Sequence, residues 1–467
     1  MINALEIVLI LVSHGPQQGR LVQGRPTPPL HKGNVMPVEN SRISGLYKMT
    51  VEERRRLVSE VAGLSTDQVA ALANYGELDE QAADRMIENV IGTMSLPVGV
   101  ATNFIVDGKH YLIPFCVEES SVVAAASNMA KRCLSKGGFS TNNDPPVMIG
   151  QLQLLEIEDM EHAMKAIEGA KDELLAFCND VPSRMIALGG GCKDILTRRL
   201  TTELGEMLVM HLLVDCRDAM GANAVNTMVE RVAPTIEELT GGRAHLRILS
   251  NLAGHRLARV KATFTPEEMA SDGTREGGLA IIKGILEAHM FAVEDPYRAT
   301  THNKGIMNAI SSIALACGQD WRAIEAGCHA WPTLQHGKYT SMSHWEQDDD
   351  GNLVGSMELP MAVGIVGGAS KVHPAAQANL AILGVETAQE LAGIMLCAGL
   401  AQNLGALRAL STKGIQAGHM KLHAKNMAVS AGAVGEEIDL LASRLQAFEG
   451  HRSQTLVEQW LKELREG

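Results

Sequence analysis

The most constraining feature of this sequence is an ordered series of strand and helix patterns between residues 147 and 254. Strand-like runs rich in β-branched and apolar residues lie at 147–157, 193–201, 206–215 and 244–250. Segments with helical apolar spacing lie at 159–178 and 219–239. The order is strand–helix–strand–strand–helix–strand, which predicts a compact split β–α–β unit, the ferredoxin-like arrangement βαββαβ.

The sequence around this unit is mainly helical. Thr50 and Glu53 have the spacing of a capping box, and Asp107–Gly108 is a hairpin turn between strand patterns. Further helices are predicted at 78–90, 119–131, 280–291, 304–317, 387–410 and 435–461. We therefore predict an α+β protein with a large helix-rich domain (41–146 and 255–413), an inserted smaller domain (147–254), a mobile helical C-terminal segment (414–467) and a loose N-terminal extension (1–40).

Composition excludes several classes of protein. Of the 467 residues, 20% are charged, which is a normal value for a folded soluble protein and excludes a mostly disordered chain. The net charge is −13 and there is no Lys/Arg block, so nucleic-acid binding is not expected. The eight cysteines are scattered, which indicates reduced thiols in a cytoplasmic protein. No apolar run approaches the length of a membrane span, so we expect no membrane association.

Two glycine-rich segments lack the spacing of a standard dinucleotide fold. Neither residues 189–192 nor residues 364–370 read G-x-G-x-x-G after a strand. A better phosphate site is Asp218–Asn223, where a predicted strand turns into a predicted helix, because helix N-termini attract anions. The alternative is that Asp218 only caps that helix.

Three charged residues stand out in polar segments. Glu119 opens a predicted helix, where it could complement the helix dipole or, if buried, donate a proton. Lys304 lies at the start of a predicted helix, where a cation is unfavourable, so it is either solvated or functional. Asp320 has the position of an ordinary N-cap.

His419 and His423 are four residues apart, a spacing that can bind a metal. Neither a His-Glu-x-x-His motif nor a third ligand cluster accompanies them. We therefore predict no metal site, and we expect one catalytic histidine or two surface histidines.

Together these segments resemble 3-hydroxy-3-methylglutaryl-coenzyme A (HMG-CoA) reductase, specifically the soluble bacterial class II enzymes. The resemblance covers residues 42–460 in unbroken order. It rests on the segments 88–92, 117–121, 218–223, 295–304, 318–322, 364–370 and 418–420. Each is weak alone, but their joint order is specific. No membrane region precedes them, as in the soluble enzymes.

The resemblance implies a four-electron interconversion of HMG-CoA and mevalonate plus CoA through mevaldehyde, in mevalonate catabolism. By this resemblance Lys304 lies beside the substrate carbonyl oxygen and Glu119 donates a proton on the aldehyde step. Asp320 bridges Lys304 and Glu119, and His419, on the mobile C-terminal segment, protonates the departing CoA thiolate. These residue types suit the reaction, because a fixed ammonium stabilises a developing oxyanion.

The same resemblance implies the binding residues. Substrate-binding positions are Arg298, Asn308, Ser121, Glu88 and Asn251. Cofactor-binding positions are Asp218, Met220, Gly221, Asn223, Gly189 and Gly190. The cofactor is NAD(H), with NADP(H) possible. Pro182, two residues after Asp180, stands where NADH-preferring relatives carry an aspartate, so this position leaves the choice open. NADH is favoured because the chain as a whole resembles the catabolic bacterial members.

The implied assembly is a homodimer with the active site at the subunit interface, possible also as a larger oligomer of dimers such as a hexamer of dimers. The implied ligands are HMG-CoA, mevalonate and CoA, with no metal. One alternative keeps the CoA site without redox chemistry, as a CoA-dependent lyase or acyltransferase. Another is an inactive binding protein, which would require loss of Glu119, Lys304, Asp320 or His419; all four are present.

Overall fold

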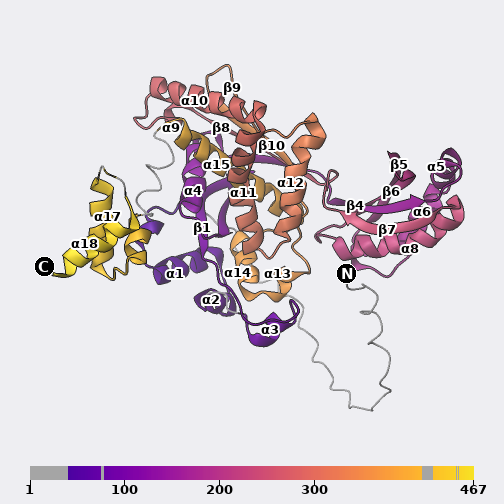
Figure 1. Cartoon of the computed structure of the whole chain (residues 1–467), viewed down its shortest axis with the longest axis horizontal. Helices are drawn as coiled ribbons and strands as arrows, with labels where there is room; N and C mark the ends of the chain where they lie inside the picture. The colour runs from indigo at the N-terminus through magenta and orange to yellow at the C-terminus, as the bar shows by residue number, and fades with distance from the viewer. Residues whose placement is uncertain (1–39, 75–77, 413–423, 449, 451, 467) are drawn as a thin grey trace, which may run out of the picture. The chain divides into compact units, whose positions relative to one another are not determined.

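The computed structural model describes residues 40–74, 78–412, 424–448, 450 and 452–466. The predicted extension 1–40 therefore lies outside the described residues, apart from Asn40. His419 and His423 also lie outside them, so the structure does not test their predicted roles. Figure 1 shows the helices and strands that are named below.

The N-terminal part confirms one helix prediction and shortens another. Helix α1 (Val51–Ala62) begins with the predicted capping box between Thr50 and Glu53. It is followed by α2 (Thr66–Ala73) and α3 (Glu80–Asp84). The predicted helix 78–90 is wrong beyond Asp84, and Asn89 has a φ of 56°, a left-handed conformation that cannot continue a right-handed helix.

The larger sheet has the strand order β2-β1-β3-β8-β10-β9. Its strands are β1 (Val98–Val106), β2 (Lys109–Cys116), β3 (Phe139–Asn143), β8 (Leu257–Phe264), β9 (Ser343–Gln347) and β10 (Leu353–Pro360). The predicted hairpin β1–β2 is confirmed, with Asp107 and Gly108 both at positive φ, as a tight hairpin turn requires.

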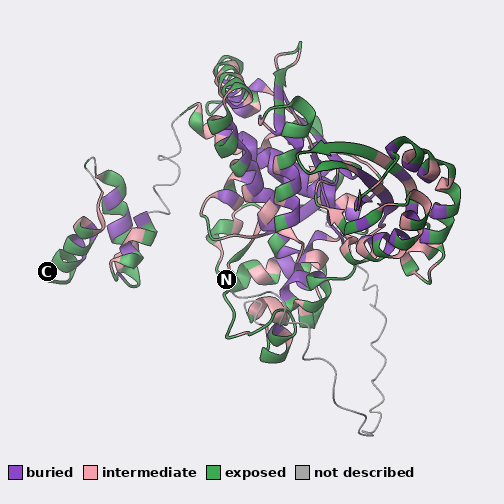
Figure 2. Cartoon of the chain, turned by 45° about the vertical axis from the view of Figure 1, so that its right-hand side comes forward, coloured by how far each residue is buried: buried purple, intermediate pink, exposed green. Residues whose placement is uncertain are grey.

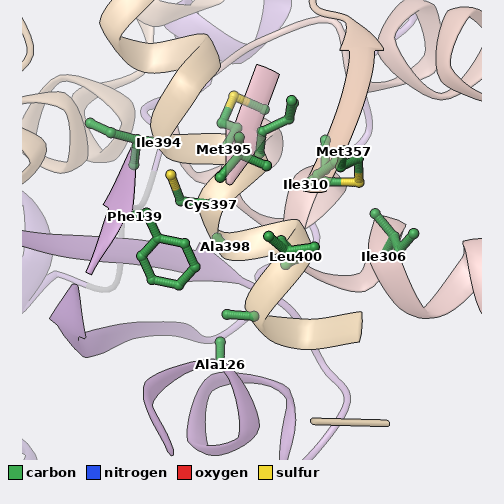
Figure 3. Packing of buried hydrophobic residues seen from close by; sticks show 14 of the residues in the cluster. Ala126, Phe139, Ile306, Ile310, Met357, Ile394, Met395, Cys397, Ala398 and Leu400 are labelled. Carbon is green, nitrogen blue, oxygen red and sulfur yellow. The ribbon is translucent and has the colours of Figure 1, made fainter. Parts of the chain in front are cut away.

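Helices pack around this sheet, and buried residues gather at the centre of this part of the chain (Figure 2). These helices include the long helix α15 (Ala388–Leu410), whose side chains are mostly buried. The others are α4 (Val122–Arg132), α9 (Pro266–Met269), α10 (Arg275–Glu294), α11 (Pro296–Ala316), α12 (Trp321–His336), α13 (Ala369–Val372) and α14 (Pro374–Leu383), with short 3-10 turns at 46–48 and 134–136. Figure 3 shows α15 in this core, with Met395, Cys397 and Leu400 among Phe139 and Ile310.

Small residues on α15 let the neighbouring helix approach closely. A Cβ atom at Gly399 would lie 3.0 Å from Ile310 Cδ1 on α11. Because a core is close-packed, this contact fixes the spacing of the two helices and thus the placement of the functional residues on α11.

Contrary to the sequence expectation, one helix among the described residues has the length and composition of a membrane span. That helix is α15, and 83% of its most apolar window is buried inside the protein. Burial by the surrounding helices and the sheet identifies it as a core helix of this fold.

The smaller sheet has the order β5-β6-β4-β7, with all neighbours antiparallel. Its strands are β4 (Val147–Leu155), β5 (Gly191–Thr202), β6 (Gly205–Asp215) and β7 (Arg243–Ser250), and the helices are α5 (Met160–Gly169), α6 (Lys171–Asn179), α7 (Arg184–Ala187) and α8 (Ala222–Thr240). This is the predicted ferredoxin-like order. The predicted helix 159–178 is two helices, because the chain leaves helical geometry at Ala170.

The C-terminal part contains α17 (Glu436–Ala447) and α18 (Gln454–Glu466). The prediction of one continuous helix over 435–461 is therefore wrong, because Phe448 has an extended backbone that ends α17. Leu445, Val457 and Trp460 pack together in a small core of this segment.

A buried histidine on α11 predicts an acid-sensitive core. His302 is 3% exposed, and its Nε2 lies 2.9 Å from Ser343 Oγ and 3.0 Å from Asn403 Nδ2. Burial lowers its pKa to about 3, so the folded protein keeps it neutral while the unfolded chain takes up a proton below pH 6.5. Between pH 7 and pH 5 we expect a loss of about 2 kcal/mol in the free energy of unfolding from this residue.

Urea unfolding at the two pH values measures this loss. A His302→Gln variant is less stable at pH 7, but its free energy of unfolding should fall less between pH 7 and pH 5. An unchanged pH dependence in that variant would assign the acid sensitivity to other groups, such as the neighbouring buried His289.

Candidate functional site

Lys304 and Glu119 form an ion pair, although 185 positions separate them in the sequence. Lys304 Nζ on α11 lies 2.9 Å from Glu119 Oε2, in the segment between β2 and α4. Glu119 precedes the N-cap Ser121 and is not part of the first turn of α4. The structure thus favours the pairing of Glu119 with a cation over complementation of the helix dipole.

The prediction that Lys304 lies at a helix start is wrong. Helix α11 begins at Pro296, and the Asp295 carboxylate caps it by accepting a bond from the Arg298 N–H at 2.6 Å. Lys304 is therefore well inside α11, where the dipole argument does not apply. Because Asp295–Pro296 is a strong start signal, the helix boundary could have been found from the sequence.

Asp320 has a different partner from the one expected. Its carboxylate accepts the Ala323 N–H at 3.1 Å, as the N-cap of α12, and lies 3.1 Å from Arg322 Nη2. Within the residues that the structure describes, it forms no bond to Lys304 or Glu119. The N-cap interpretation is confirmed, and the predicted bridge is not present in this chain.

The Lys304–Glu119 pair is more exposed than a buried proton donor requires. The Lys304 side chain is 60% exposed and that of Glu119 is 39% exposed. The expectation of burial is therefore wrong for the single chain. At this exposure water screens the attraction between the two charges. The ion pair becomes strong only if another protein surface covers it and excludes water.

Three predicted substrate residues are close in sequence to Lys304 or Glu119. Asn308 is one helical turn after Lys304, so both lie on the same face of α11. Ser121 follows Glu119 by two residues and has a φ of 75°. Arg298 is partly buried, and its burial lowers the pKa of its guanidinium; its backbone, but not its side chain, is hydrogen-bonded among the described residues.

Two other predicted substrate residues are exposed, and among the described residues neither forms a hydrogen bond or an ion pair with Lys304 or Glu119. Glu88 is exposed in the irregular segment after α3. Asn251 is exposed after β7, and its carbonyl lies against α12, where a Cβ atom at Gly327 would lie 2.6 Å from it. Neither residue is therefore a direct polar partner of the ion pair in the described part of the chain.

The predicted cofactor segment 218–223 is anchored to the chain that follows α12. The Asp218 carboxylate accepts the Ala388 N–H at 3.0 Å, and its carbonyl accepts the Ile365 N–H at 2.8 Å. The idea that Asp218 caps its own helix is wrong, because the N-cap of α8 is Gly221, which has no side-chain cap bond. The start of α8 is thus left without a side-chain acceptor.

Glycine is required within this segment and on the turn beside it. Gly221 has a φ of 102°, and a Cβ atom there would lie 2.2 Å from Cys216 Sγ. The other two predicted glycines lie on the neighbouring turn: the Gly189 carbonyl accepts bonds from Arg217 and Lys193, and a Cβ atom at Gly190 would lie 2.7 Å from the Asp215 carbonyl. Gly189 and Gly190 therefore lie beside the strand end from which segment 218–223 departs.

Sequence reasoning did not assign roles to Gln319 and Arg256. The Gln319 side chain accepts the Gly364 N–H at 2.8 Å, which connects the segment before Asp320 to the segment that binds Asp218. Arg256 is buried against the backbone of Ala219. Gln319 lies inside segment 318–322, one of the segments on which the family resemblance rests, so the sequence could have indicated its role. No local sequence pattern indicates a role for Arg256.

The arrangement can stabilise negative charge and move a proton. An ammonium beside a carboxyl group can stabilise an oxyanion on a substrate carbonyl and can help the carboxyl group to exchange its proton. Among the described residues there is no group of three His, Cys, Asp or Glu side chains that could hold a metal ion.

Comparisons with known proteins agree on one family. The family model described as hydroxymethylglutaryl-coenzyme A reductase matches residues 50–424. A 3-hydroxy-3-methylglutaryl-coenzyme A reductase from Archaeoglobus fulgidus is 52% identical over 407 residues, covering 87% of this chain and 91% of the relative. A probable enzyme of the same name from Borreliella burgdorferi is 35% identical over 349 residues, covering 75% and 79%.

Solved structures agree with the sequence relatives. The Streptococcus pneumoniae 3-hydroxy-3-methylglutaryl-coenzyme A reductase matches with a TM-score of 0.77 at 38% identity and covers 90% of this chain and 99% of its own. A structure of the pneumococcal class II enzyme bound to NADPH in open conformations matches with a TM-score of 0.75, also at 38% identity, and covers 89% and 100%. The chain therefore belongs to the hydroxymethylglutaryl-coenzyme A reductase family of oxidoreductases and has the fold of its class II members.

Proposed function

We propose that this protein interconverts HMG-CoA and mevalonate through mevaldehyde. The balanced reaction consumes one HMG-CoA, two reduced nicotinamide cofactors and two protons, and it yields mevalonate, CoA and two oxidised cofactors. The observation that carries the proposal is the Lys304–Glu119 ion pair, formed in a chain of this family. The cofactor, when bound, supplies hydride, and the residues of this chain orient the substrate and handle charge and protons.

In the proposed mechanism Lys304 points its ammonium at the carbonyl oxygen that becomes negative as hydride arrives. Glu119, at 2.9 Å from Lys304, then protonates the alkoxide on the aldehyde step. Asp320 balances the charge of this pair. To contact Lys304, its carboxylate must first break its ion pair with Arg322. Such an exchange is feasible because the Asp320 side chain is 41% exposed and its ion pair is weak in water.

We assign substrate binding to the residues around this pair. Arg298 binds the carboxylate of the hydroxymethylglutaryl group, since its partly buried guanidinium forms no side-chain bond among the described residues. Asn308 and Ser121 bind the hydroxyl and carbonyl groups. Glu88 and Asn251 contribute to a substrate site only when another surface packs against the ion pair.

We propose that this other surface is a second copy of the chain. The segment that contains Glu88 also exposes large apolar side chains: Ile91 is 104% exposed and Met94 is 88% exposed. Exposed apolar side chains so close together are typical of a subunit interface. A homodimer with the active site at the interface, or a larger assembly such as a hexamer of dimers, would cover the exposed ion pair.

The proposed domain roles follow the sequence division. The parts 41–146 and 255–413 bind HMG-CoA, the part 147–254 binds the cofactor, and the part 414–467 closes over CoA. The cofactor segment fits a dinucleotide phosphate, because α8 starts without a side-chain cap and helix N-termini attract anions. The proposed location is the cytoplasm, without membrane or nucleic-acid partners.

His419 provides a test of the two chemical steps. If it protonates the CoA thiolate, a His419→Gln variant should lose about a hundredfold in reduction of HMG-CoA and keep its reduction of added mevaldehyde. His423→Gln is the matched control, and it should leave both rates nearly unchanged. Equal losses in both reactions for His419→Gln would argue against thiolate protonation.

The cofactor and the direction of flux are tested together. We propose NADH as the preferred cofactor and mevalonate catabolism as the direction. Asp180 is exposed within the cofactor part and would repel a 2′-phosphate, although Arg184 is exposed four residues later and could attract one. Assays with NADH and NADPH in both directions, on the wild type and on Asp180→Asn, decide between them. A higher kcat/KM with NADPH in the wild type would refute the proposed preference.

The same assay tests the alternative of a CoA-dependent lyase or acyltransferase. That activity predicts no change in nicotinamide absorbance when HMG-CoA is added. Turnover of HMG-CoA without cofactor oxidation would therefore replace our proposal.

A further inference from the structure

We infer that Arg256 is a positioning residue for the nicotinamide cofactor. Its buried guanidinium holds the backbone of Ala219 and Met220 in the conformation that receives the dinucleotide. The inference rests on the proposed role of segment 218–223 and goes beyond it, because Arg256 belongs to none of the motifs on which the family resemblance rests.

The guanidinium of Arg256 binds backbone carbonyl groups from two separate segments. Nη1 donates to the carbonyls of Ala219 at 3.1 Å and Met220 at 3.2 Å, and Nη2 donates to the carbonyl of Val363. Arg256 thus joins the cofactor segment to the glycine-rich segment that begins at Gly364. Within the described residues, Arg256 forms no ion pair with a carboxylate within 4.0 Å.

This cation is costly to bury. Arg256 is only 4% exposed, and burial lowers its pKa to about 10, while Asp215 and Asp218 oppose the shift. The group therefore stays charged at neutral pH. A buried charge with only neutral acceptors contributes less to stability than an apolar side chain of the same size. Its placement is better explained by the backbone conformation that it holds.

That conformation is constrained from the other sides as well. A Cβ atom at Gly364 would lie 2.4 Å from the Met220 N atom, and one at Gly221 would lie 2.2 Å from Cys216 Sγ. Because Arg256 binds the carbonyls of Ala219 and Met220, its positive charge lies within hydrogen-bond distance of the two residues that precede Gly221, the N-cap of α8. The unpaired N–H groups of the first helical turn and this charge both favour a phosphate group at the same place.

The test compares the affinities for cofactor and for HMG-CoA. We expect Arg256→Met to raise the Kd of NADH and NADPH, measured by nicotinamide fluorescence, by about thirtyfold, with the KM of HMG-CoA within about twofold of wild type. Arg256→Lys keeps the charge and fewer bonds, so it should recover part of the affinity. A purely structural role predicts a lower Tm without this difference between the two ligands.

Arg259 provides a matched control on β8. It pairs with Asp144 and Glu358 at 2.6 Å each, and it lies outside the proposed site. Arg259→Met should lower the Tm and leave the cofactor Kd unchanged. If both arginine variants raise the cofactor Kd equally, or if Arg256→Met leaves it unchanged, the inference is wrong.

Two variants keep the test decisive if Arg256→Met does not fold. Gly364→Ala would place a Cβ atom 2.4 Å from the Met220 N atom without removing the charge of Arg256, and it should also raise the cofactor Kd. Asn223→Ala tests the cofactor segment itself, since Asn223 is exposed at the start of α8. A raised Kd for Asn223→Ala, with normal values for Gly364→Ala and Arg256→Lys, would keep the proposed site and refute the role of Arg256. Normal cofactor binding in all of them would refute the cofactor segment and the inference together.

Discussion

Lys304→Ala is expected to lower kcat by about a thousandfold in the reduction of both HMG-CoA and mevaldehyde. Each hydride transfer creates an oxyanion, and the ammonium that stabilises it would be gone. The Kd for HMG-CoA should change little, because the loss falls on the transition state. Steady-state assays with each substrate, and direct binding of HMG-CoA, measure the two effects separately.

The control for this variant is another exposed lysine–glutamate pair. Lys338 Nζ lies 2.9 Å from Glu294 Oε2, the same distance as in the Lys304–Glu119 pair. Lys338→Ala should keep nearly full activity, because its pair is an ordinary surface ion pair. Near-normal turnover in Lys304→Ala would remove Lys304 from the mechanism.

Glu119→Gln should have the second largest effect. Loss of the proton donor is expected to slow mevaldehyde reduction by about a hundredfold or more, because a carboxamide cannot transfer the proton. Rate measurements with added mevaldehyde on the wild type and on Glu119→Gln test this expectation.

The neighbouring carboxylate is a suitable control. Glu118 precedes Glu119 and is exposed, and no ion pair involves it in the described residues. Glu118→Gln should keep its rate of mevaldehyde reduction. If Glu118→Gln and Glu119→Gln reduce mevaldehyde at the same rate, the ion pair of Glu119 with Lys304 has no role in catalysis.

The sequence predicted those features that depend on residues near one another in the chain. The capping box at Thr50 and Glu53, the hairpin at Asp107–Gly108 and the four-strand order of the smaller sheet are all confirmed. Each follows from local conformational preference or from the period of apolar residues. The breaks in the predicted helices 78–90, 159–178 and 435–461 were missed, because apolar periodicity continues across a short break.

The sequence by itself also determined which charged residues to consider, since the ordered motifs single out Glu119, Lys304 and Asp320. Only the tertiary structure decided how they pair: it brought Lys304 to Glu119 and left Asp320 with Arg322. It alone placed Arg256 behind the cofactor segment. The physical reason is that the partner of a charged side chain is set by the packing of distant segments, whereas a cap or a turn is set by residues three or four positions away.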